Sequence, residues 1–462
     1  MYKKITLSAI LSVIAAAANA AEPPTVKLGG RFDTMVGHVR QTGEYRDVID
    51  NVNLLSIPGY KSEGKGNRSA IVNDTKIDIN IDGVTDSGLI KYGGLIRLNA
   101  DTSKSTANQS GIAEKTMAYI QHDSIGRLEG GNYYGAGGVF EMDTTAALAK
   151  AAYGVDGFWS KWASETAYID LSGVSPFSPF GLTKMDNLSG YKFIVSPNLP
   201  SNYSAQYYAS APKLTAYTMP HPTLTIGVSF IPDMDSTGSV ATRASRDDGP
   251  VDTDRKPIGI AGNRPTFKNI ISGGVQFKHN FNQEWNIKAG LVGEIGKAKK
   301  FVGTDLLRDL KAYEAGLAIG YQDFVIGGTY GSWMKTGTYK TKLEGTKQGS
   351  QYWTIGAAYQ YGNLGYSLNF MKSKKAGGLE SIGTDVQRRF VEKSFPGAAI
   401  SPNKSFSDTT YNKFTNISLG VEYKAAPGFM PYAEASRFHF KDANAPKSNQ
   451  GVVYLIGTRL TF

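Results

Sequence analysis

Apolar and polar residues alternate along most of this chain with a period of two. In "WNIKAGLVGEI" (285–295), Trp285 and Ile287 share one face, and Asn286 and Lys288 share the other. This period is typical of a β-strand, because successive side chains of a strand point to opposite sides. The same alternation recurs in other segments, among them 75–83, 351–371, 413–424 and 451–462. The pattern predicts a series of strands, each with one apolar and one polar face.

Alternation by itself fits a soluble sandwich as well as a membrane barrel. The length of the runs favours the barrel, because about 9–12 residues is what a tilted strand needs to cross the hydrocarbon layer. Aromatic residues such as Trp285 and Tyr361 gather near strand ends, where an aromatic girdle meets the lipid headgroups. In lipid every backbone N–H and C=O needs a partner, and only a closed ring of strands has no edge.

The strands are placed by this alternation and by the turn residues between them. The predicted segments are 26–36, 75–84, 89–99, 114–122, 127–132, 204–211, 224–231, 268–280, 285–296, 310–321, 323–334, 350–361, 364–374, 412–424, 429–440 and 450–462. Short turns rich in Gly, Asn and Asp alternate with long polar segments, as in outer-membrane barrels. The prediction is an all-β fold, a transmembrane antiparallel up-and-down β-barrel of about sixteen strands.

The first twenty residues differ from the rest of the chain. Lys3 and Lys4 precede the apolar stretch "ITLSAILSVIAAAA", and Ala18-Asn19-Ala20 is a small-x-small cleavage site. These features predict a cleaved signal peptide at 1–20 and an exported single barrel domain at 21–462. The chain has no cysteine, which excludes disulfides, thiolate nucleophiles and Cys-type zinc sites.

Charge and histidine placement exclude several other functions. The formal net charge of +10 falls by two to +8 when Lys3 and Lys4 leave with the leader, and the basic residues form no stripe of the kind that binds nucleic acid. The five histidines are scattered without metal-ligand spacing. The strand map brings no Ser or Asp close to a His as a catalytic pair. We therefore expect no enzyme, no cofactor, no metal site and no nucleic-acid partner.

Four segments resemble the bacterial outer-membrane general diffusion porins, a Gram-negative family of trimeric sixteen-stranded barrels. They are "KLGGRFD" (27–33), "TKIDINIDGVTDSGLIKYGGLI" (75–96), "EKTMAYIQHDSIGRLEGGNYYG" (114–135) and the closing "GTRLTF" (457–462). The resemblance implies an outer-membrane location in contact with lipid, a homotrimer, and small hydrophilic solutes as the molecules transported.

The resemblance also implies a loop after the fifth strand, here about 133–203, that folds into the barrel and constricts it. By this resemblance Arg31 and Lys76 form a basic wall, to which the alternation adds Arg97 and Arg127. Acidic residues of the loop would face that wall: Glu141, Asp143, Asp156, Glu165 and Asp170. Where relatives carry an inward basic residue on the fourth strand, this chain is expected to have Thr116.

The segment 450–462 is expected to close the cylinder against 26–36. Tyr454, Leu460 and Phe462 lie on its apolar face, and an aromatic residue is favourable at the membrane interface. The resemblance implies that the barrel-insertion machinery reads these residues as an outer-membrane insertion signal.

The expected function is passive diffusion of small hydrophilic solutes and ions through a water-filled channel. Cations on one side of a constriction and carboxylates on the other select solutes by size and charge. The positive net charge favours anions, although the acidic loop opposes this preference. The alternatives are a substrate-specific channel, which would show a ladder of pore-facing aromatics, and a barrel adhesin or surface antigen, which would carry no current.

Overall fold

The computed structural model describes residues 23–42, 68–100, 113–163, 193–201, 211–234, 260–261, 264–265, 267–299, 307–338, 340, 348–376, 411–441 and 448–462. The predicted signal peptide 1–20 lies outside these residues. No helix in the described part of the chain is long and apolar enough to cross a bilayer.

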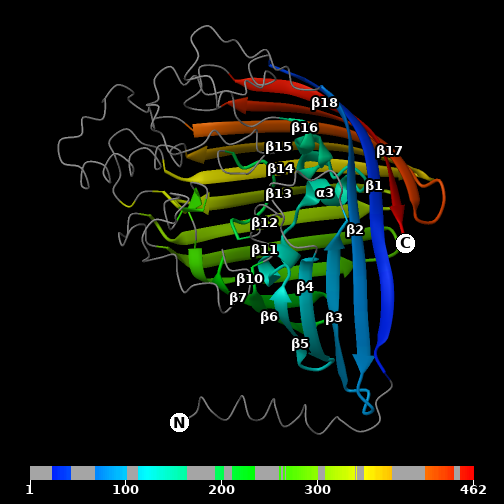
Figure 1. Ribbon diagram of the computed structural model, residues 1–462, viewed down its shortest axis with the longest axis vertical. Coiled ribbons are helices and arrows are strands. Elements are labelled where there is room, and N and C mark those ends of the chain that lie inside the picture. The colour runs from blue at the N-terminus through cyan, green and yellow to red at the C-terminus, as the bar shows by residue number, and fades with distance from the viewer. Residues whose placement is uncertain are drawn as a thin grey trace, which may run out of the picture.

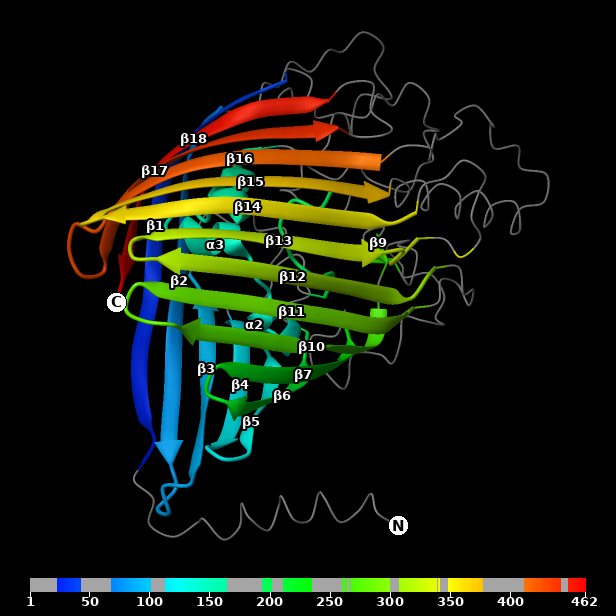
Figure 2. The same cartoon turned by 180° about the vertical axis from the view of Figure 1, so that it is seen from behind.

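Sixteen strands form a closed barrel in which each strand pairs with its neighbours in an antiparallel ladder (Figures 1 and 2). They are β1 (Thr25–Gln41), β2 (Ser69–Val84), β3 (Ile90–Asn99), β4 (Ala113–His122), β5 (Gly126–Asn132), β6 (Lys213–His221), β7 (Leu224–Asp233), β10 (Phe267–Asn280), β11 (Trp285–Ala298), β12 (Leu310–Tyr321), β13 (Phe324–Met334), β14 (Ser350–Tyr361), β15 (Leu364–Ala376), β16 (Tyr411–Tyr423), β17 (Phe429–Lys441) and β18 (Asn449–Thr461). The ladder between β1 and β18 closes the ring. The predicted all-β up-and-down barrel is confirmed.

Two further strands, β8 (Ile260–Ala261) and β9 (Arg264–Pro265), form a small hairpin apart from the barrel. The barrel has a long-loop end, from which the long connections leave, and a short-turn end, where tight turns join the strands.

The sixth strand was predicted in the wrong place. It occupies Lys213–His221, not 204–211, of which residues 204–210 lie outside the described part. The alternation in β6 is weak, because Thr215 faces the lumen while Ala216 and Thr218 face outward. Its ladder with β7 also shifts register between Thr218 and His221, around Pro220, which has no backbone N–H to donate.

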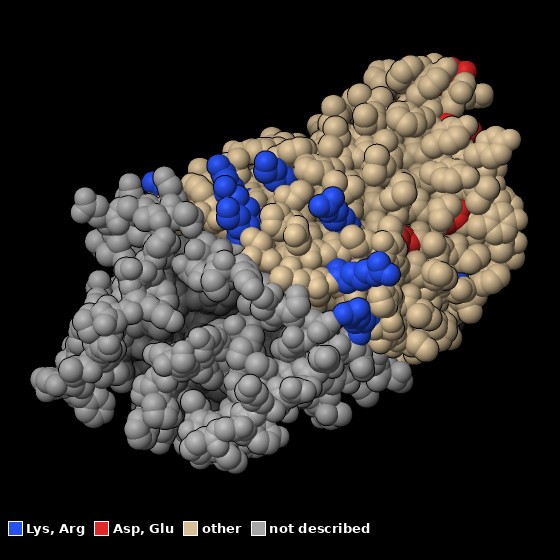
Figure 3. Space-filling model, turned by 90° about the horizontal axis from the view of Figure 1, so that it is seen from above, with Lys and Arg blue, Asp and Glu red and all other residues tan. Residues whose placement is uncertain are grey.

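The outward face of the barrel is apolar over most of its height. Ile71 and Ile456, for example, are 70% and 71% exposed. Near the short turns this face carries aromatic rings, among them Trp285 and Tyr321, whose ring centroids lie 4.5 Å apart. One side of this surface is seen in Figure 3, where most of the described surface carries neither acidic nor basic side chains. An apolar belt edged by aromatics is the surface of a membrane barrel.

After β5 the chain turns into the barrel. The described residues 133–163 and 193–201, called the inner segment below, include α2 (Ala136–Phe140), α3 (Thr144–Leu148), η4 (Gly154–Asp156) and η5 (Phe158–Lys161). In sequence order α2 packs on β7 and β10, α3 on β13 and β14, η4 on β15 and β16, and η5 on β18. Figures 1 and 2 show α2 and α3 inside the ring of strands. The inner segment therefore runs around the inner wall.

Glycines on the inward face of the wall make room for the inner segment. A Cβ at Gly316 would lie 2.2 Å from Met142 Cβ, and one at Gly37 would lie 2.2 Å from the Trp162 ring. These distances are shorter than any van der Waals contact. A Cβ at Gly290 would lie 2.6 Å from the inner segment, and one at Gly327 or Gly356 would lie 3.0 Å from it. The inner segment lies on a backbone surface that the sequence leaves free of side chains.

Candidate channel lining

Basic side chains gather on the lumen side of β1–β5. The ladders place Arg31 opposite Lys76, and Arg97 opposite Asp78 on one side and Lys115 on the other. Arg127 of β5 lies inward as well, where its guanidinium carbon is 3.8 Å from the centre of the Tyr119 ring. The structure thus brings the four predicted basic residues onto one wall.

Each cation of this wall has a carboxylate partner. Arg97 donates to both oxygens of Asp78, at 2.7 and 2.8 Å, a bidentate geometry that fixes the guanidinium plane. Arg127 Nε lies 2.6 Å from Glu129, and Arg31 pairs with Asp74. The side chains of the three arginines remain 27–29% exposed. They therefore present charge to the lumen while their positions are fixed.

Lys115, and not Thr116, is the inward basic residue of β4. Thr116 lies opposite Ile96 and faces outward. The expectation was wrong by one residue, because Lys115 is the residue that lies opposite the inward Arg97. In the sequence, the alternation that runs from Lys115 through the later residues of β4 was the signal that Lys115 faces inward. The buried Lys115 ammonium lies 3.7 Å from the centre of the Tyr134 ring, a cation–π contact to the inner segment.

Arg459 of β18 connects the barrel seam to the inner segment, and sequence reasoning missed it. Its Nε and Nη2 donate to the two oxygens of Asp33 at 2.9 and 3.2 Å, and its Nη1 donates to the carbonyl of Lys150 at 2.7 Å. The guanidinium also stacks over Tyr153. Asp33 and Arg459 lie at inward positions of the first and last predicted strands. This alternation was the signal in the sequence that both face the lumen.

The predicted loop carboxylates that the structure describes form hydrogen bonds to other residues of the inner segment. Asp143 accepts hydrogen bonds from Ala146 N–H at 3.1 Å and from Thr145 Oγ1 at 2.6 Å, and so caps α3. Asp156 is hydrogen-bonded to Asp143, and Glu141 accepts the Leu199 N–H. Burial raises the pKa of Asp143, and burial together with the nearby Asp143 charge raises that of Asp156. Glu165 and Asp170 lie outside the described residues.

Four inward glutamates, from β11, β12, β16 and β17, hold the inner segment through its backbone. Glu314 accepts the Met142 N–H at 2.7 Å and Glu294 accepts the Ser201 N–H at 2.9 Å. Glu422 and Glu434 accept N–H groups from the η4 region in the same way, from Ala151 at 2.9 Å and Gly154 at 3.1 Å. An isolated Glu on the polar face of a strand, as in "LVGEI", was the signal that sequence reasoning did not use.

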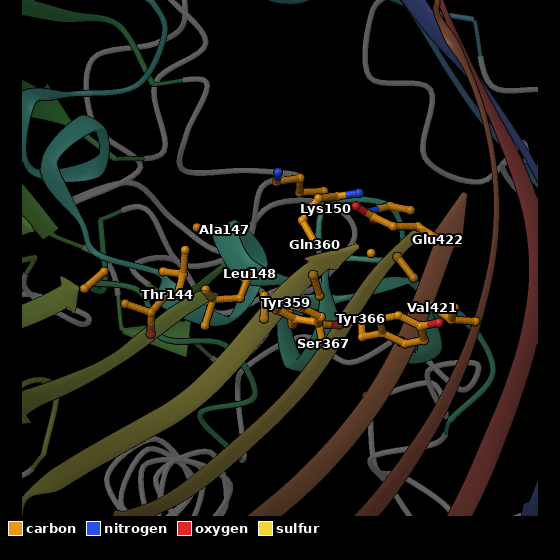
Figure 4. A pocket seen from close by; sticks show the side chains of 18 of the residues that line it. Thr144, Ala147, Leu148, Lys150, Tyr359, Gln360, Tyr366, Ser367, Val421 and Glu422 are labelled. Atoms are coloured by element: carbon orange, nitrogen blue, oxygen red, sulfur yellow. The ribbon is translucent and has the colours of Figure 1, made fainter. Parts of the chain in front are cut away.

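A groove of about 310 Å³ lies between the inner segment and the short-turn half of β11–β17. Figure 4 shows Lys150, Gln360 and Glu422 at this groove, with Ala147 and Leu148 of the inner segment beside them. Its lining combines polar termini of both charge signs with small apolar side chains, so it can hold water and small polar solutes. Within the described ranges no group of three His, Asp or Glu side chains has an arrangement that would hold a metal ion.

These features define a class: a closed membrane-type β-barrel whose lumen carries charged side chains and an inward-folded segment. The model of the Gram-negative porin family matches residues 6–443. The chain belongs to this family.

Two curated proteins and one solved structure are similar to this chain. The chain is 27% identical over 289 residues to a protein of Rickettsia bellii (strain RML369-C), covering 55% of this chain and 57% of that protein. It is 26% identical over 268 residues to protein RC0098 of Rickettsia conorii (strain ATCC VR-613 / Malish 7), covering 51% and 53%. The chain thus spans little more than half the length of these curated relatives. The anion-selective porin from Comamonas acidovorans has a similar fold, with a TM-score of 0.51 at 13% identity, covering 95% of this chain and 100% of that one.

Proposed function

We propose that the protein is an outer-membrane porin, a water-filled channel for passive diffusion of small hydrophilic solutes and ions, selected by size and charge. The observation that carries this proposal is the partly exposed row of arginines, Arg31, Arg97 and Arg127, on the lumen face of β1–β5. Partly exposed charges inside a membrane barrel indicate a lumen that water reaches, because burying a charge without water or a partner costs free energy. The family and the fold favour a channel over an enzyme.

The inner segment acts as the constriction in this proposal. It occupies lumen space along β7–β18 and reaches the charged wall of β1–β5 through the contact of Tyr134 with Lys115. The paired cations and carboxylates of that wall create a local field in the water, which replaces part of the hydration of a polar solute. An apolar solute gains nothing from this field. Selection by size follows from the space that the inner segment takes.

We further propose a preference for anions, based on two lysines near the short turns. Lys278 of β10 and Lys288 of β11 lie directly opposite each other on the inward face. Neither pairs with a carboxylate of the described residues, whereas the lumen-facing Arg31, Arg97 and Arg127 are all paired. An unneutralised cation pair at one end of the lumen lowers the entry barrier for anions.

The native assembly is proposed to be a homotrimer in the outer membrane, inserted by the barrel-insertion machinery through Tyr454, Leu460 and Phe462. The outward row Gly94, Ala118 and Gly130, directly opposite one another on β3, β4 and β5, supports a contact between protomers here. Small side chains let neighbouring backbones approach closely. Family membership supports the outer-membrane location and the trimer.

Planar-bilayer recording tests the channel and its selectivity together. Purified protein should give a stable conductance that rises with salt without saturation, and a reversal potential on the anion side in a salt gradient. The variant Lys278→Gln/Lys288→Gln should shift the reversal potential towards cations. The matched control is Lys297→Gln, because Lys297 faces outward and pairs with Asp309 at 2.7 Å. This variant should leave the reversal potential unchanged. Absence of current would contradict the channel, and current that one solute blocks at saturation would indicate a substrate-specific channel.

A further inference from the structure

A band of basic residues lies on the outward face of the barrel, next to the long-loop end. Its members come from β15, β16, β17 and β1 and are Arg40, Lys372, Lys374, Lys413, Arg437 and Lys441. This set is called the outer basic band. Figure 3 shows basic side chains gathered on this face along one border of the described surface, and acidic ones only towards the other end.

The strand register places like charges directly beside one another within this band. Lys374 lies opposite Lys413, and Lys413 lies opposite Lys441. Like charges at directly opposed positions of a sheet destabilise it. His439 lies next to this row, opposite Thr415. An anion outside the sheet would relieve the repulsion within this row of three lysines.

The described surface around the band supplies no such anion. No outward-facing position of β14–β18 or β1 holds Asp or Glu. None of the six cations forms an ion pair with a carboxylate of the described residues, and Lys374 contacts only the Tyr411 ring, with its Nζ 5.1 Å from the ring centre. Lys297, an outward lysine elsewhere at the long-loop end, differs from the band because it pairs with Asp309 at 2.7 Å.

The band borders the apolar surface that faces lipid. Phe370 and Ile417 lie in the same row of the sheet as Arg437, and Tyr454 lies one step further towards the short turns. Trp353 lies opposite Lys372, so an aromatic ring and a cation share the same level of the wall. Aromatic rings and lysines at the edge of an apolar belt mark the depth of the lipid headgroups. The cations therefore lie where phosphate groups of a membrane lipid would be.

We propose that the outer basic band binds the phosphorylated headgroup of a membrane lipid in the leaflet at the long-loop end. The inference rests on the proposed membrane orientation of the barrel and adds a lipid partner on its outer wall. Lysine and arginine recognise phosphate through charge-assisted hydrogen bonds. Acyl chains of the same lipid would cover Phe370, Ile417 and the apolar surface beyond. A lipid thus matches both the outer basic band and the apolar surface beside it, whereas a soluble anion matches only the band.

Binding of a purified phosphorylated lipid to the folded protein tests the proposal. The probe is bis-phosphorylated lipid A, and its enzymatically dephosphorylated form is the comparison, each titrated into full-length protein in non-ionic detergent and read by native mass spectrometry. We expect binding of the phosphorylated form and binding at least tenfold weaker for the dephosphorylated one. Inorganic phosphate in the same assay separates a lipid site from a general anion site, and equal occupancy by phosphate alone would overturn the proposal.

Charge-removing and charge-preserving variants make the test specific. Lys374→Gln/Lys413→Gln/Lys441→Gln should weaken lipid binding by roughly a hundredfold, since each basic residue near a phosphate surface contributes about equally. Lys374→Arg/Lys413→Arg/Lys441→Arg should keep binding, and Lys297→Gln, whose cation is already paired, should not change it. Unchanged binding in the glutamine variant would overturn the proposal. So would wild-type protein that conducts ions normally yet binds no phosphorylated lipid, and this result would leave the channel function standing.

Discussion

Trp159 of the inner segment stacks on Phe414 of β16, with ring centroids 5.8 Å apart and an angle of 11° between the planes. Phe438 of β17 packs near the same indole, with its centroid 5.7 Å from it. Trp159 is completely buried, and its Nε1 donates to the Val155 carbonyl at 2.8 Å. An aromatic core inside the barrel therefore holds the inner segment against the wall, in addition to the glutamate contacts.

Removing this indole should loosen the inner segment without opening the barrel. Trp159→Ala leaves a cavity, and truncation of a buried aromatic costs about 3–5 kcal/mol. We expect larger open-channel noise in bilayer recordings and faster protease cleavage within 133–163. Trp353→Ala, which removes an outward-facing ring, should change neither. Quiet channels and intact protease resistance in Trp159→Ala would mean that the glutamates alone hold the inner segment.

The backbone surface beneath the inner segment gives a second prediction. A methyl group at Gly316 would lie 2.2 Å from Met142 Cβ, so Gly316→Ala must displace the inner segment from the wall. The matched control is Gly293→Ala, where the nearest atom to the new Cβ is 3.5 Å away. We expect altered single-channel conductance for Gly316→Ala and wild-type conductance for Gly293→Ala. Both variants should migrate as folded barrels on unheated gels, and equal conductance in the two would contradict the close packing.

The buried carboxyl pair of the inner segment predicts a pH dependence. The pKa values of Asp143 and Asp156 are raised above the ordinary value of 3.8, chiefly by burial. The packed segment therefore binds protons more tightly than the released segment does. Its stabilisation is complete below pH 3.8 and is lost as the pH rises through the raised values. Open-channel noise should increase with pH over this range.

Substitution of one carboxyl group tests the origin of that dependence. Asp156→Asn keeps a hydrogen-bonding group next to Asp143 but removes one of the two negative charges, so the noise should depend less on pH. Asp86→Asn, in the exposed turn between β2 and β3, should retain the wild-type profile. A profile that Asp156→Asn leaves unchanged would assign the pH dependence to other groups.

Most of the barrel could be predicted from the sequence because one physical rule governs it. Strands with a lipid face and a water face must alternate, and Arg31, Lys76, Arg97 and Arg127 follow that rule. The rule places a strand end too early where the hydrogen-bonded ladder continues beyond the alternating apolar residues. β1 was predicted to end at residue 36 but pairs as far as Gln41, and its outward positions there are His38 and Arg40.

The inner segment was less predictable because its contacts join residues far apart in the sequence. The Glu314 carboxylate meets the Met142 N–H across 172 positions. No local pattern specifies which inward Glu will meet which backbone donor. Asp143 and Asp156 were likewise expected to face the basic wall, and only the fold shows that they contact each other.

The seam of the barrel gives the last prediction. Phe462 donates its N–H to the Gly30 carbonyl at 3.2 Å and accepts the Gly30 N–H at 3.0 Å, while its ring is 64% exposed at the short-turn end. Deletion of Phe462 removes both hydrogen bonds, at about 0.5–1.5 kcal/mol each, and an aromatic residue from the lipid interface. We expect export to continue while the heat-modifiable, folded form in the outer membrane decreases. Phe462→Tyr keeps the backbone pair and the ring, so it should assemble as the wild type does. A truncated chain that assembles in normal amounts would show that neither contact at Gly30 is needed to close the cylinder.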